Sequence, residues 1–236
     1  MEKIKIDLNI NEFPVSIHPY MQGATMYDSS CSDHAKVYYS DLGYYIKVEN
    51  KGLLEGEAKL VALFADLELG PEMMLYLSED KDYMVTKEAV GEDCIAPRYL
   101  EEPEKLVKVL AETMRFLHGA FDGERREVFA GADIPRSASM DLYEKHGYLD
   151  KVKCDTLIHG DFCLPNILLK DGKFSSFIDV GAAGMGDRHL DIYWVLWSLN
   201  YNLKTDKYTD LFLDMYGREQ VDMEVLKLVA HVEKLG

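Results

Sequence analysis

Three side chains that can do chemistry lie close together in the stretch LIHGDFCLPNILL, residues 157–169: His159, Asp161 and Asn166. The apolar runs at both ends of this stretch predict two short strands, so the polar residues fall in the loop between them. A carboxylate in such a loop can accept a hydroxyl proton, and an amide oxygen can bind a hard metal ion. The loop is therefore a candidate catalytic site.

The segment after this loop predicts the position of a second carboxylate. NILLK and KFSSFID flank the pair Asp171-Gly172, which is a strong signal for a two-residue type I′ hairpin. Counted outward from that turn, Asn166 pairs with Phe177. Asp179 then lies two positions further, roughly 7 Å along the strand. The amide oxygen of Asn166 and the carboxylate of Asp179 are thus predicted to meet at the open end of one hairpin.

These residues together favour phosphoryl transfer. Asn166 and Asp179 offer the oxygen ligands with which proteins hold Mg²⁺ beside phosphates, and Asp161 is placed to accept a hydroxyl proton. The order of Asp161, Asn166 and Asp179 matches the catalytic loop and metal-binding segment of kinases. His159 is predicted to brace the loop by hydrogen bonding. The alternative is a β-hairpin whose polar residues only cap loops, which explains one such residue better than it explains all of them.

The elements that must position this site divide the chain into two regions. Residues 35–40 and 44–48 predict a strand hairpin, residues 55–64 a helix and residues 82–87 another strand. The rest is mostly helical, with a helix that starts near Pro103 and stops at Gly119, and a buried helix over residues 191–203. Gly217 is expected to end a further helix and Asp222 to cap the last one. We predict a sheet-bearing lobe over residues 1–88 and a helical lobe over residues 89–236.

Composition narrows the class of protein. The 236 residues carry 26 basic and 42 acidic side chains, a net charge of −16, which argues against a nucleic-acid binder and suits either a cationic partner or an ordinary acidic enzyme. No apolar run has the length of a signal peptide or a membrane span. The four cysteines lack disulfide or zinc spacing, so we expect a cytoplasmic protein: Cys31, Cys94, Cys154 and Cys163.

The block HGDFCLPNILLKDGKFSSFIDVGAAGMGDRHLDI, residues 159–192, closely resembles the corresponding part of the aminoglycoside 3′-phosphotransferases. The resemblance is dense here and sparser before residue 150. It implies an α+β, protein-kinase-like fold with a small β-sheet lobe and a larger helical lobe. It also implies Mg²⁺-dependent transfer of the terminal phosphate of ATP, or of GTP, to the 3′-hydroxyl of an aminoglycoside, which gives antibiotic resistance.

The resemblance also assigns a nucleotide site. Lys47 in YYIKVE resembles the strand lysine that pairs with the phosphates, and Glu57 resembles its ion-pair partner. Tyr45 resembles the aromatic residue that stacks on adenine, although a plain strand tyrosine explains it nearly as well. The remaining expected contacts are a phosphate contact from the loop before residue 35 and backbone groups of the segment between the lobes: Ser32, Lys87 and Ala89.

The acceptor site is less defined by the resemblance. Segment 118–159 is shorter than in the antibiotic kinases, and the chain ends in EKLG. The residues expected to face a polycationic acceptor are Glu233, Gly236 and Asp133. Asp191 is expected to anchor the backbone of the catalytic loop, and Asp187 and Arg188 to form a structural pair. Two alternatives stay open: a kinase of another small alcohol or amino sugar, and a kinase-like binding module without activity. The protein is expected to be a monomer or a homodimer.

Overall fold

The computed structural model describes residues 3–30, 35–120 and 134–236. The chain divides into two compact units, Met1–Ala89 and Val90–Gly236. The sequence placed this division after Glu88, one residue earlier.

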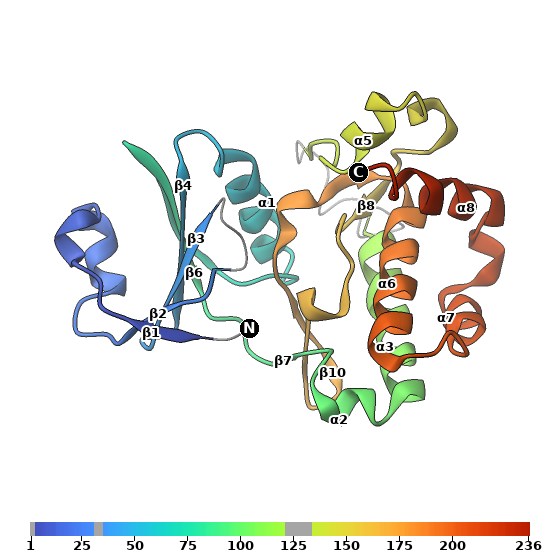
Figure 1. Cartoon of the computed structure of the whole chain (residues 1–236), viewed down its shortest axis with the longest axis horizontal. Helices are drawn as coiled ribbons and strands as arrows, with labels where there is room; N and C mark the ends of the chain where they lie inside the picture. The colour runs from blue at the N-terminus through green and yellow to red at the C-terminus, as the bar shows by residue number, and fades with distance from the viewer. Residues whose placement is uncertain (1–2, 31–34, 121–133) are drawn as a thin grey trace. The chain divides into compact units, whose positions relative to one another are not determined.

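The first unit is built on a six-stranded antiparallel sheet (Figure 1). Its strands, in spatial order, are β1 (Ile4–Ile6), β2 (Met26–Asp28), β3 (Lys36–Ser40), β4 (Tyr44–Asn50), β6 (Lys81–Lys87) and β5 (Met73–Ser78). Two 3-10 helices, η1 (Ile10–Glu12) and η2 (Val15–Tyr20), separate β1 from β2, and helix α1 (Glu55–Asp66) follows β4. The predicted hairpin is present as β3 and β4, and the predicted helix as α1.

Side chains of strand β4 point alternately to the two faces of the sheet, and only one of these faces is covered by the core. Ile46 and Val48 belong to a buried cluster that includes Ile17 of η2 and Val85 of β6. Because successive side chains of a strand point to opposite faces, Lys47 lies on the face away from this cluster. The core therefore holds the strand that carries Lys47 while leaving its ammonium outside the apolar interior.

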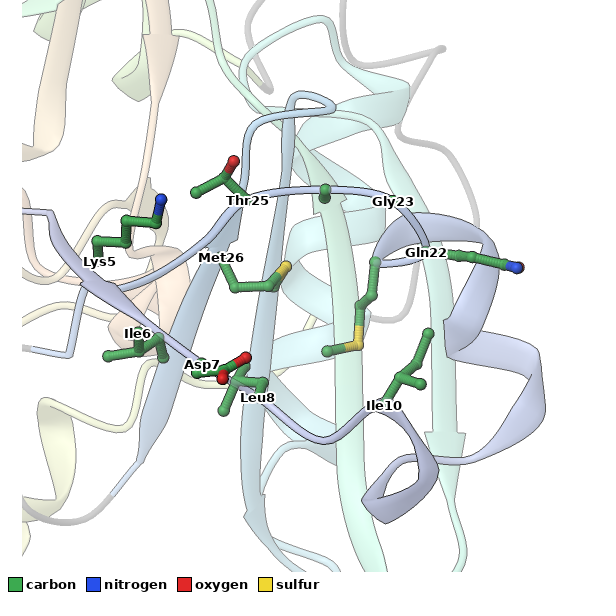
Figure 2. A pocket seen from close by; sticks show the side chains of 11 residues that line it. Lys5, Ile6, Asp7, Leu8, Ile10, Gln22, Gly23, Thr25 and Met26 are labelled. Carbon is green, nitrogen blue, oxygen red and sulfur yellow. The ribbon is translucent and has the colours of Figure 1, made fainter.

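A groove of about 400 Å³ lies within the first unit, beside β1 and the segment between η2 and β2 (Figure 2). Lys5 and Asp7 supply its charged lining, and Met21 and Met26 line it with sulfur-containing side chains. Of the described residues that the sequence assigned to the nucleotide, none lines this groove.

The second unit contains two small sheets and a set of helices (Figure 1). Strands β7 (Glu92–Asp93), β9 (Ile167–Lys170) and β10 (Lys173–Phe177) form one sheet, with β9 in the middle, and β8 (Thr156–Ile158) pairs with β11 (Gly184–Gly186). The helices are α2 (Pro97–Leu100), α3 (Pro103–His118), α5 (Met140–Lys145), α6 (Arg188–Leu203), α7 (Thr209–Tyr216) and α8 (Met223–Val232). Short 3-10 helices connect them: η3 (Leu149–Lys151), η4 (Leu164–Asn166), η5 (Val180–Ala182) and η6 (Arg218–Gln220).

Helix α6 is central to this unit, since it contacts α3, α7, α8 and β8. A buried cluster joins it to α5 and α8 through Leu190, Met140, Tyr143 and Val229. The predicted helix signals are confirmed: Pro103 is the first residue of α3, Gly119 is its C-cap, and the Asp222 side chain accepts from Glu224 N at the start of α8. Within the described ranges, no helix is both long and apolar enough to cross a membrane.

The register of the β9–β10 hairpin differs from the prediction. Lys170 pairs with Lys173 at the turn, but Phe177 pairs with Ile167 and not with Asn166, because the register shifts between Phe174 and Ser176. Ile178 then lies opposite Asn166, and its amide donates to Asn166 O over 3.0 Å. Asp179 is consequently one position beyond the residue opposite Asn166, closer than predicted.

Candidate active site

The loop between β8 and η4 is held by one buried carboxylate. Asp191, with no exposed surface, accepts from His159 N through Oδ2 at 2.8 Å and from Gly160 N through Oδ1 at 2.9 Å. Two backbone amides thus satisfy a charge that would be costly to bury without partners. Because Asp191 lies in the first turn of α6, the position of the loop depends on the position of that helix.

The same carboxylate is tied to two further helices. His118 Nε2, at the end of α3, lies 3.1 Å from Asp191 Oδ2, and His118 Nδ1 lies 2.8 Å from the Tyr216 hydroxyl of α7. Burial raises the pKa of Tyr216 to about 12, so its hydroxyl keeps its proton at neutral pH. In the tautomer with the ring proton on Nε2, His118 donates to Asp191 and accepts from Tyr216. The sequence did not predict this role for His118, because its partners lie far away along the chain.

Gly160 allows the loop to approach η5 closely. Its φ is +83°, and a Cβ at this position would collide with the carbonyl oxygen of Ala182 in η5. That oxygen also accepts a 2.6 Å hydrogen bond from Ser137 Oγ. Glycine is therefore required here both by the backbone conformation and by the space.

Asp161 and Asn166 are directly hydrogen-bonded. Asn166 Nδ2 donates to Asp161 O at 3.1 Å and to Asp161 Oδ2 at 2.8 Å. Both partners are acceptors, so the amide must present its NH₂ group to Asp161. Asn166 Oδ1 accepts no hydrogen bond from the described residues and is available as a ligand. Asp161 is half-buried and Asn166 is buried.

The ring of His159 connects Asp161 to the strand end before Asp179. Asp161 N donates to His159 Nδ1 at 3.3 Å, so the ring proton is on Nε2, which lies 3.1 Å from Ile178 O. This geometry matches the bracing role expected of His159. The ring is fully buried and lies among Phe162 and Phe177, which fixes its orientation.

Asp179 stands at the end of β10 in an unusual conformation. Its φ and ψ of 57° and 50° are left-handed, a region that aspartate tolerates better than most residues. The side chain is exposed and caps no helix, although it precedes η5. The carboxylate is therefore free to bind a ligand from solvent.

The donor set of Asn166 and Asp179 fits Mg²⁺. It offers a free amide oxygen and a free carboxylate, the hard ligands that this ion prefers, with further positions left for water and phosphate oxygens. No group of three or more His, Cys, Asp or Glu in the described part of the chain could hold a metal. A softer ion that needs several nitrogen or sulfur ligands does not fit here.

Cys163 lies in the same loop but is no nucleophile. Burial raises the pKa of its thiol well above the usual range, and the charge of Asp161 acts in the same direction. A thiol that stays protonated at neutral pH does not attack phosphate. The nearby Ser198 Oγ of α6, which the sequence reasoning missed, accepts from Leu164 N at 3.0 Å and holds the far end of the loop.

In the first unit, Lys47 and Glu57 form an ion pair. Lys47 Nζ lies 2.7 Å from both carboxylate oxygens of Glu57, and the two side chains are 22% and 15% exposed. The strand and helix α1 thus fix the ammonium in one place. Its contact with phosphates stays a prediction.

The other expected nucleotide contacts are only partly available. Tyr45 packs against Tyr39, with ring centroids 5.0 Å apart. Lys87 N donates to Glu72 O at 2.9 Å within the sheet, so of its two backbone groups the amide is already bonded, and the contact of Lys87 with a base stays a prediction. Ala89 is half-buried at the end of the unit. Ser32 lies outside the described residues.

The residues expected at the acceptor site differ in their surroundings. Glu233 is half-buried and accepts from Tyr143 OH at 2.9 Å, which joins α8 to α5, and its expected contact with the acceptor stays a prediction. Burial raises the pKa of Glu233, against hydrogen bonds from Tyr143 and Trp194 that lower it. Gly236 is exposed beside Leu142 of α5. Asp133 lies outside the described residues.

The predicted pair of Asp187 and Arg188 is also wrong. Asp187 caps α6 and binds His189, through its backbone amide at 2.9 Å and its ring Nδ1 at 2.6 Å, while Arg188 Nη1 binds Gln220. Lys153 N donates to the other oxygen of Asp187. Burial alone would raise the pKa of Asp187, but these hydrogen bonds outweigh it and lower the pKa.

Comparison with known proteins defines the class. The model of the phosphotransferase enzyme family matches residues 49–229. A probable aminoglycoside 3′-phosphotransferase of Lactococcus lactis is 39% identical, over 98% of this chain and 98% of its own. The chain therefore belongs to the phosphotransferase enzyme family.

Solved structures agree with the fold. An aminoglycoside-3′-phosphotransferase of type VIII superposes with a TM-score of 0.67 at 21% identity, covering 96% of each chain. An aminoglycoside phosphotransferase from Streptomyces rimosus, in complex with ADP and streptomycin, gives 0.70 at 18% identity, over 96% of this chain and 98% of its own. These likenesses confirm the α+β, protein-kinase-like fold that the sequence predicts.

Proposed function

We propose that this protein transfers the terminal phosphate of ATP, or of GTP, to a hydroxyl of an aminoglycoside, at the 3′ position. The observation that carries the proposal is the hydrogen-bonded pair of Asp161 and Asn166 beside Asp179. The name of the Lactococcus lactis relative and the streptomycin and ADP bound to the Streptomyces rimosus protein support the acceptor and the donor. A cytoplasmic location, without nucleic-acid or membrane partners, follows from the same proposal.

Asp161 acts as the base in this reaction. As the acceptor oxygen bonds to the terminal phosphorus, its proton passes to a carboxylate oxygen of Asp161, and the bond from phosphorus to the bridging oxygen breaks to release the nucleoside diphosphate. Asn166 Nδ2 holds one oxygen of Asp161 and so orients the other. His159 keeps the loop in register with the end of β10.

Asn166 Oδ1 and the Asp179 carboxylate would hold Mg²⁺ on the nucleotide phosphates. The ion supplies positive charge that neutralises the phosphates during transfer. Lys47, oriented by Glu57, binds phosphate oxygens from the first unit. These four residues complete a set with Asp161, and the complete set speaks against a kinase-like module without activity.

The net charge of −16 suits a polycationic acceptor. Kinase activity on a neutral sugar or small alcohol is the second candidate. It is favoured by one observation, namely that Glu233, the described acid expected at the acceptor, is already bound to Tyr143.

Phosphate transfer from labelled ATP and GTP to a panel of acceptors tests the proposal. The panel contains kanamycin, neomycin, streptomycin, glucosamine, glucose and glycerol. Phosphorylation of kanamycin or neomycin with Asp161-dependent turnover supports it. Transfer to the neutral acceptors alone replaces the aminoglycoside with the second candidate. Nucleotide binding without transfer to any acceptor contradicts both.

A further inference from the structure

A short segment before α5, residues 135–139, runs alongside strand β11. Met185 N donates to Pro135 O at 2.8 Å and Ser137 N donates to Met185 O at 3.0 Å, which adds a parallel bridge to this strand. Gly184 permits the approach, because a Cβ there would lie 2.5 Å from Pro135 O. Backbone hydrogen bonds therefore hold the segment in place, and its serine hydroxyls are not needed for this pairing.

The two serines of the segment, Ser137 and Ser139, both donate to backbone oxygens of the candidate active site. Ser137 is fully buried, and its Oγ donates to Ala182 O of η5 at 2.6 Å. Ser139 Oγ donates to Gly160 O of the catalytic loop at 3.3 Å. One short segment thus contacts both the loop of the proposed base and the element that follows the proposed metal-binding aspartate.

The hydroxyl of Ser139 does not cap a helix. Ser139 directly precedes α5, a position at which a serine side chain commonly accepts from an amide of the first turn. Here its φ and ψ of −60° and −24° are already helical, and its side chain makes no capping hydrogen bond. Its printed partner is Gly160 O in the catalytic loop. The needs of α5 therefore do not explain this hydroxyl, whereas those of the loop do.

The peptide group between Gly160 and Asp161 is held at both of its polar atoms. Its oxygen accepts from Ser139, and its nitrogen donates to His159 Nδ1 at 3.3 Å. Because a peptide group is planar, fixing its oxygen and its nitrogen also fixes the direction in which the chain enters Asp161. Ser139 thus acts on the orientation of the Asp161 side chain through the backbone.

Asp179 needs support on both sides, because its left-handed φ of 57° is unfavourable for most residues with a side chain. Such a conformation persists only where the surrounding contacts hold the chain. On one side, Ile178 N donates to Asn166 O at 3.0 Å. On the other side, the buried hydrogen bond from Ser137 fixes Ala182 O at the end of η5. Ser137 therefore helps to keep the carboxylate of Asp179 where the backbone presents it.

We propose that Ser137 and Ser139 are positioning residues for phosphoryl transfer, Ser137 for the metal-binding carboxylate of Asp179 and Ser139 for the base Asp161. The inference rests on the proposed function, since the two carboxylates have these roles only in that reaction. Each serine acts through a backbone oxygen and not on a reacting atom. One segment outside the catalytic loop thus helps to set the positions of both carboxylates.

Steady-state kinetics test Ser139. Ser139→Ala should lower kcat about fivefold, the effect of one lost neutral hydrogen bond, while the KM for ATP and the KM for kanamycin change by less than about twofold. Ser139→Thr keeps the hydroxyl and should restore kcat. A role in folding alone would lower the melting temperature and leave the kcat of the folded enzyme unchanged. An unchanged kcat in Ser139→Ala, or a Thr variant as slow as the Ala variant, would overturn the inference.

Titration calorimetry tests Ser137 without any acceptor. ATP is titrated into wild type and Ser137→Ala, with and without Mg²⁺. The gain in ATP affinity that Mg²⁺ provides should fall about fivefold in the variant. The affinity without Mg²⁺ should stay unchanged, because Ser137 acts through Asp179. If Ser137→Ala does not fold, the kinetics of the Ser139 variants decide.

Tyr99→Phe is the matched control for Ser137→Ala. It also removes a hydroxyl that donates to a backbone oxygen of the same unit, Leu169 O at 3.1 Å, but this oxygen belongs to strand β9 and not to the loop or η5. The control should keep the full gain from Mg²⁺. An equal loss in both variants, or no loss in Ser137→Ala, would overturn the inference.

The outcomes separate this inference from the proposed function. If the wild type phosphorylates kanamycin and both Ala variants behave like the wild type, the inference is wrong and the function stands. If no acceptor is phosphorylated but Ser137→Ala loses the gain from Mg²⁺, the positioning of Asp179 stands and the proposed function is wrong. If Mg²⁺ gives the wild type no gain in ATP affinity and nothing is phosphorylated, both fail.

Discussion

Asn166 Nδ2 lies 2.8 Å from Asp161 Oδ2, and this one contact determines how both side chains are used. It turns the amide oxygen of Asn166 away from Asp161, where it can serve as a ligand. It also occupies one carboxylate oxygen of Asp161 and leaves the other for a hydroxyl proton. The proposed base and the proposed metal ligand are thus oriented by the same hydrogen bond.

Replacement of Asp161 by Asn should lower kcat by at least ~10²-fold, because the variant has no carboxylate to accept the proton. Nucleotide affinity and the melting temperature should change little, since the new amide oxygen can still accept from Asn166. Steady-state kinetics and calorimetric titration with ATP measure these quantities. A variant with most of its turnover would remove Asp161 from the mechanism.

Asp179→Asn should abolish Mg²⁺-dependent turnover and weaken the binding of Mg·ATP, because an amide is a poorer ligand than a carboxylate. Asparagine tolerates the left-handed backbone, so the fold should persist. Asp171→Asn is a matched control, since Asp171 has a φ of 52° and sits at the turn of the same hairpin, away from the site. Titration calorimetry compares the two variants. Equal affinity for Mg·ATP in both would refute the metal assignment.

Lys47→Ala should reduce kcat/KM for ATP by about 10²-fold or more through loss of a phosphate contact. Glu57→Gln should reduce it less, because the ammonium remains but is no longer held by a charged partner. Lys59→Ala provides the comparison, since Lys59 pairs with Glu55 on the exposed side of α1. An Lys47 variant as active as the Lys59 variant would contradict the nucleotide assignment.

Asp187→Asn should destabilise the protein by about 2 kcal/mol at pH 7, since a buried charged acceptor of several hydrogen bonds is lost. The lowered pKa of Asp187 also predicts a pH dependence. Its contribution is present above the ordinary value of about 3.9 and is lost as the pH falls through the folded-state pKa. In denaturant unfolding between pH 3 and 7, the free energy of unfolding should fall less on acidification in the variant than in the wild type. Parallel curves would contradict this role.

Glu233→Gln should keep or slightly raise the melting temperature at pH 7, because glutamine can still accept from Tyr143 without a half-buried charge. The pKa of Glu233 is raised, so the stability linked to it is present below the ordinary value of about 4.3 and lost as the pH rises through the folded-state pKa. The advantage of the variant should therefore grow with pH. Glu224→Gln, at the exposed start of α8, is the control. A tenfold rise in the kanamycin KM of Glu233→Gln alone would restore its acceptor role.

The sequence predicted those features that depend on neighbouring residues. Asp171-Gly172 set the hairpin, and Pro103, Gly119 and Asp222 set helix ends, because turns and caps are local. The shift in the hairpin register could not be predicted. Ser175, the residue displaced by the shift, donates through Oγ to Val90 O at 2.6 Å, a partner that only the tertiary fold supplies.

The failure of the predicted pair of Asp187 and Arg188 also has a physical cause. Asp187 and Arg188 are consecutive, and consecutive residues at a helix start do not face each other, whereas a capping aspartate binds the amide two residues on. The hydrogen bond between Glu233 and Tyr143 joins residues 90 positions apart, so it depends on the packing of α8 against α5 and not on local sequence.

The close approach of Gly160 to Ala182 restricts how this enzyme can evolve. Every missense change at Gly160 adds a side chain, and the obstacle is a backbone oxygen, so no substitution of Ala182 removes it. Ser137 holds that oxygen in place. Relief would require displacement of η5 and, with it, of Asp179, which directly precedes it. Under antibiotic selection, adaptation should therefore leave position 160 invariant and proceed at positions where a new side chain meets no backbone atom.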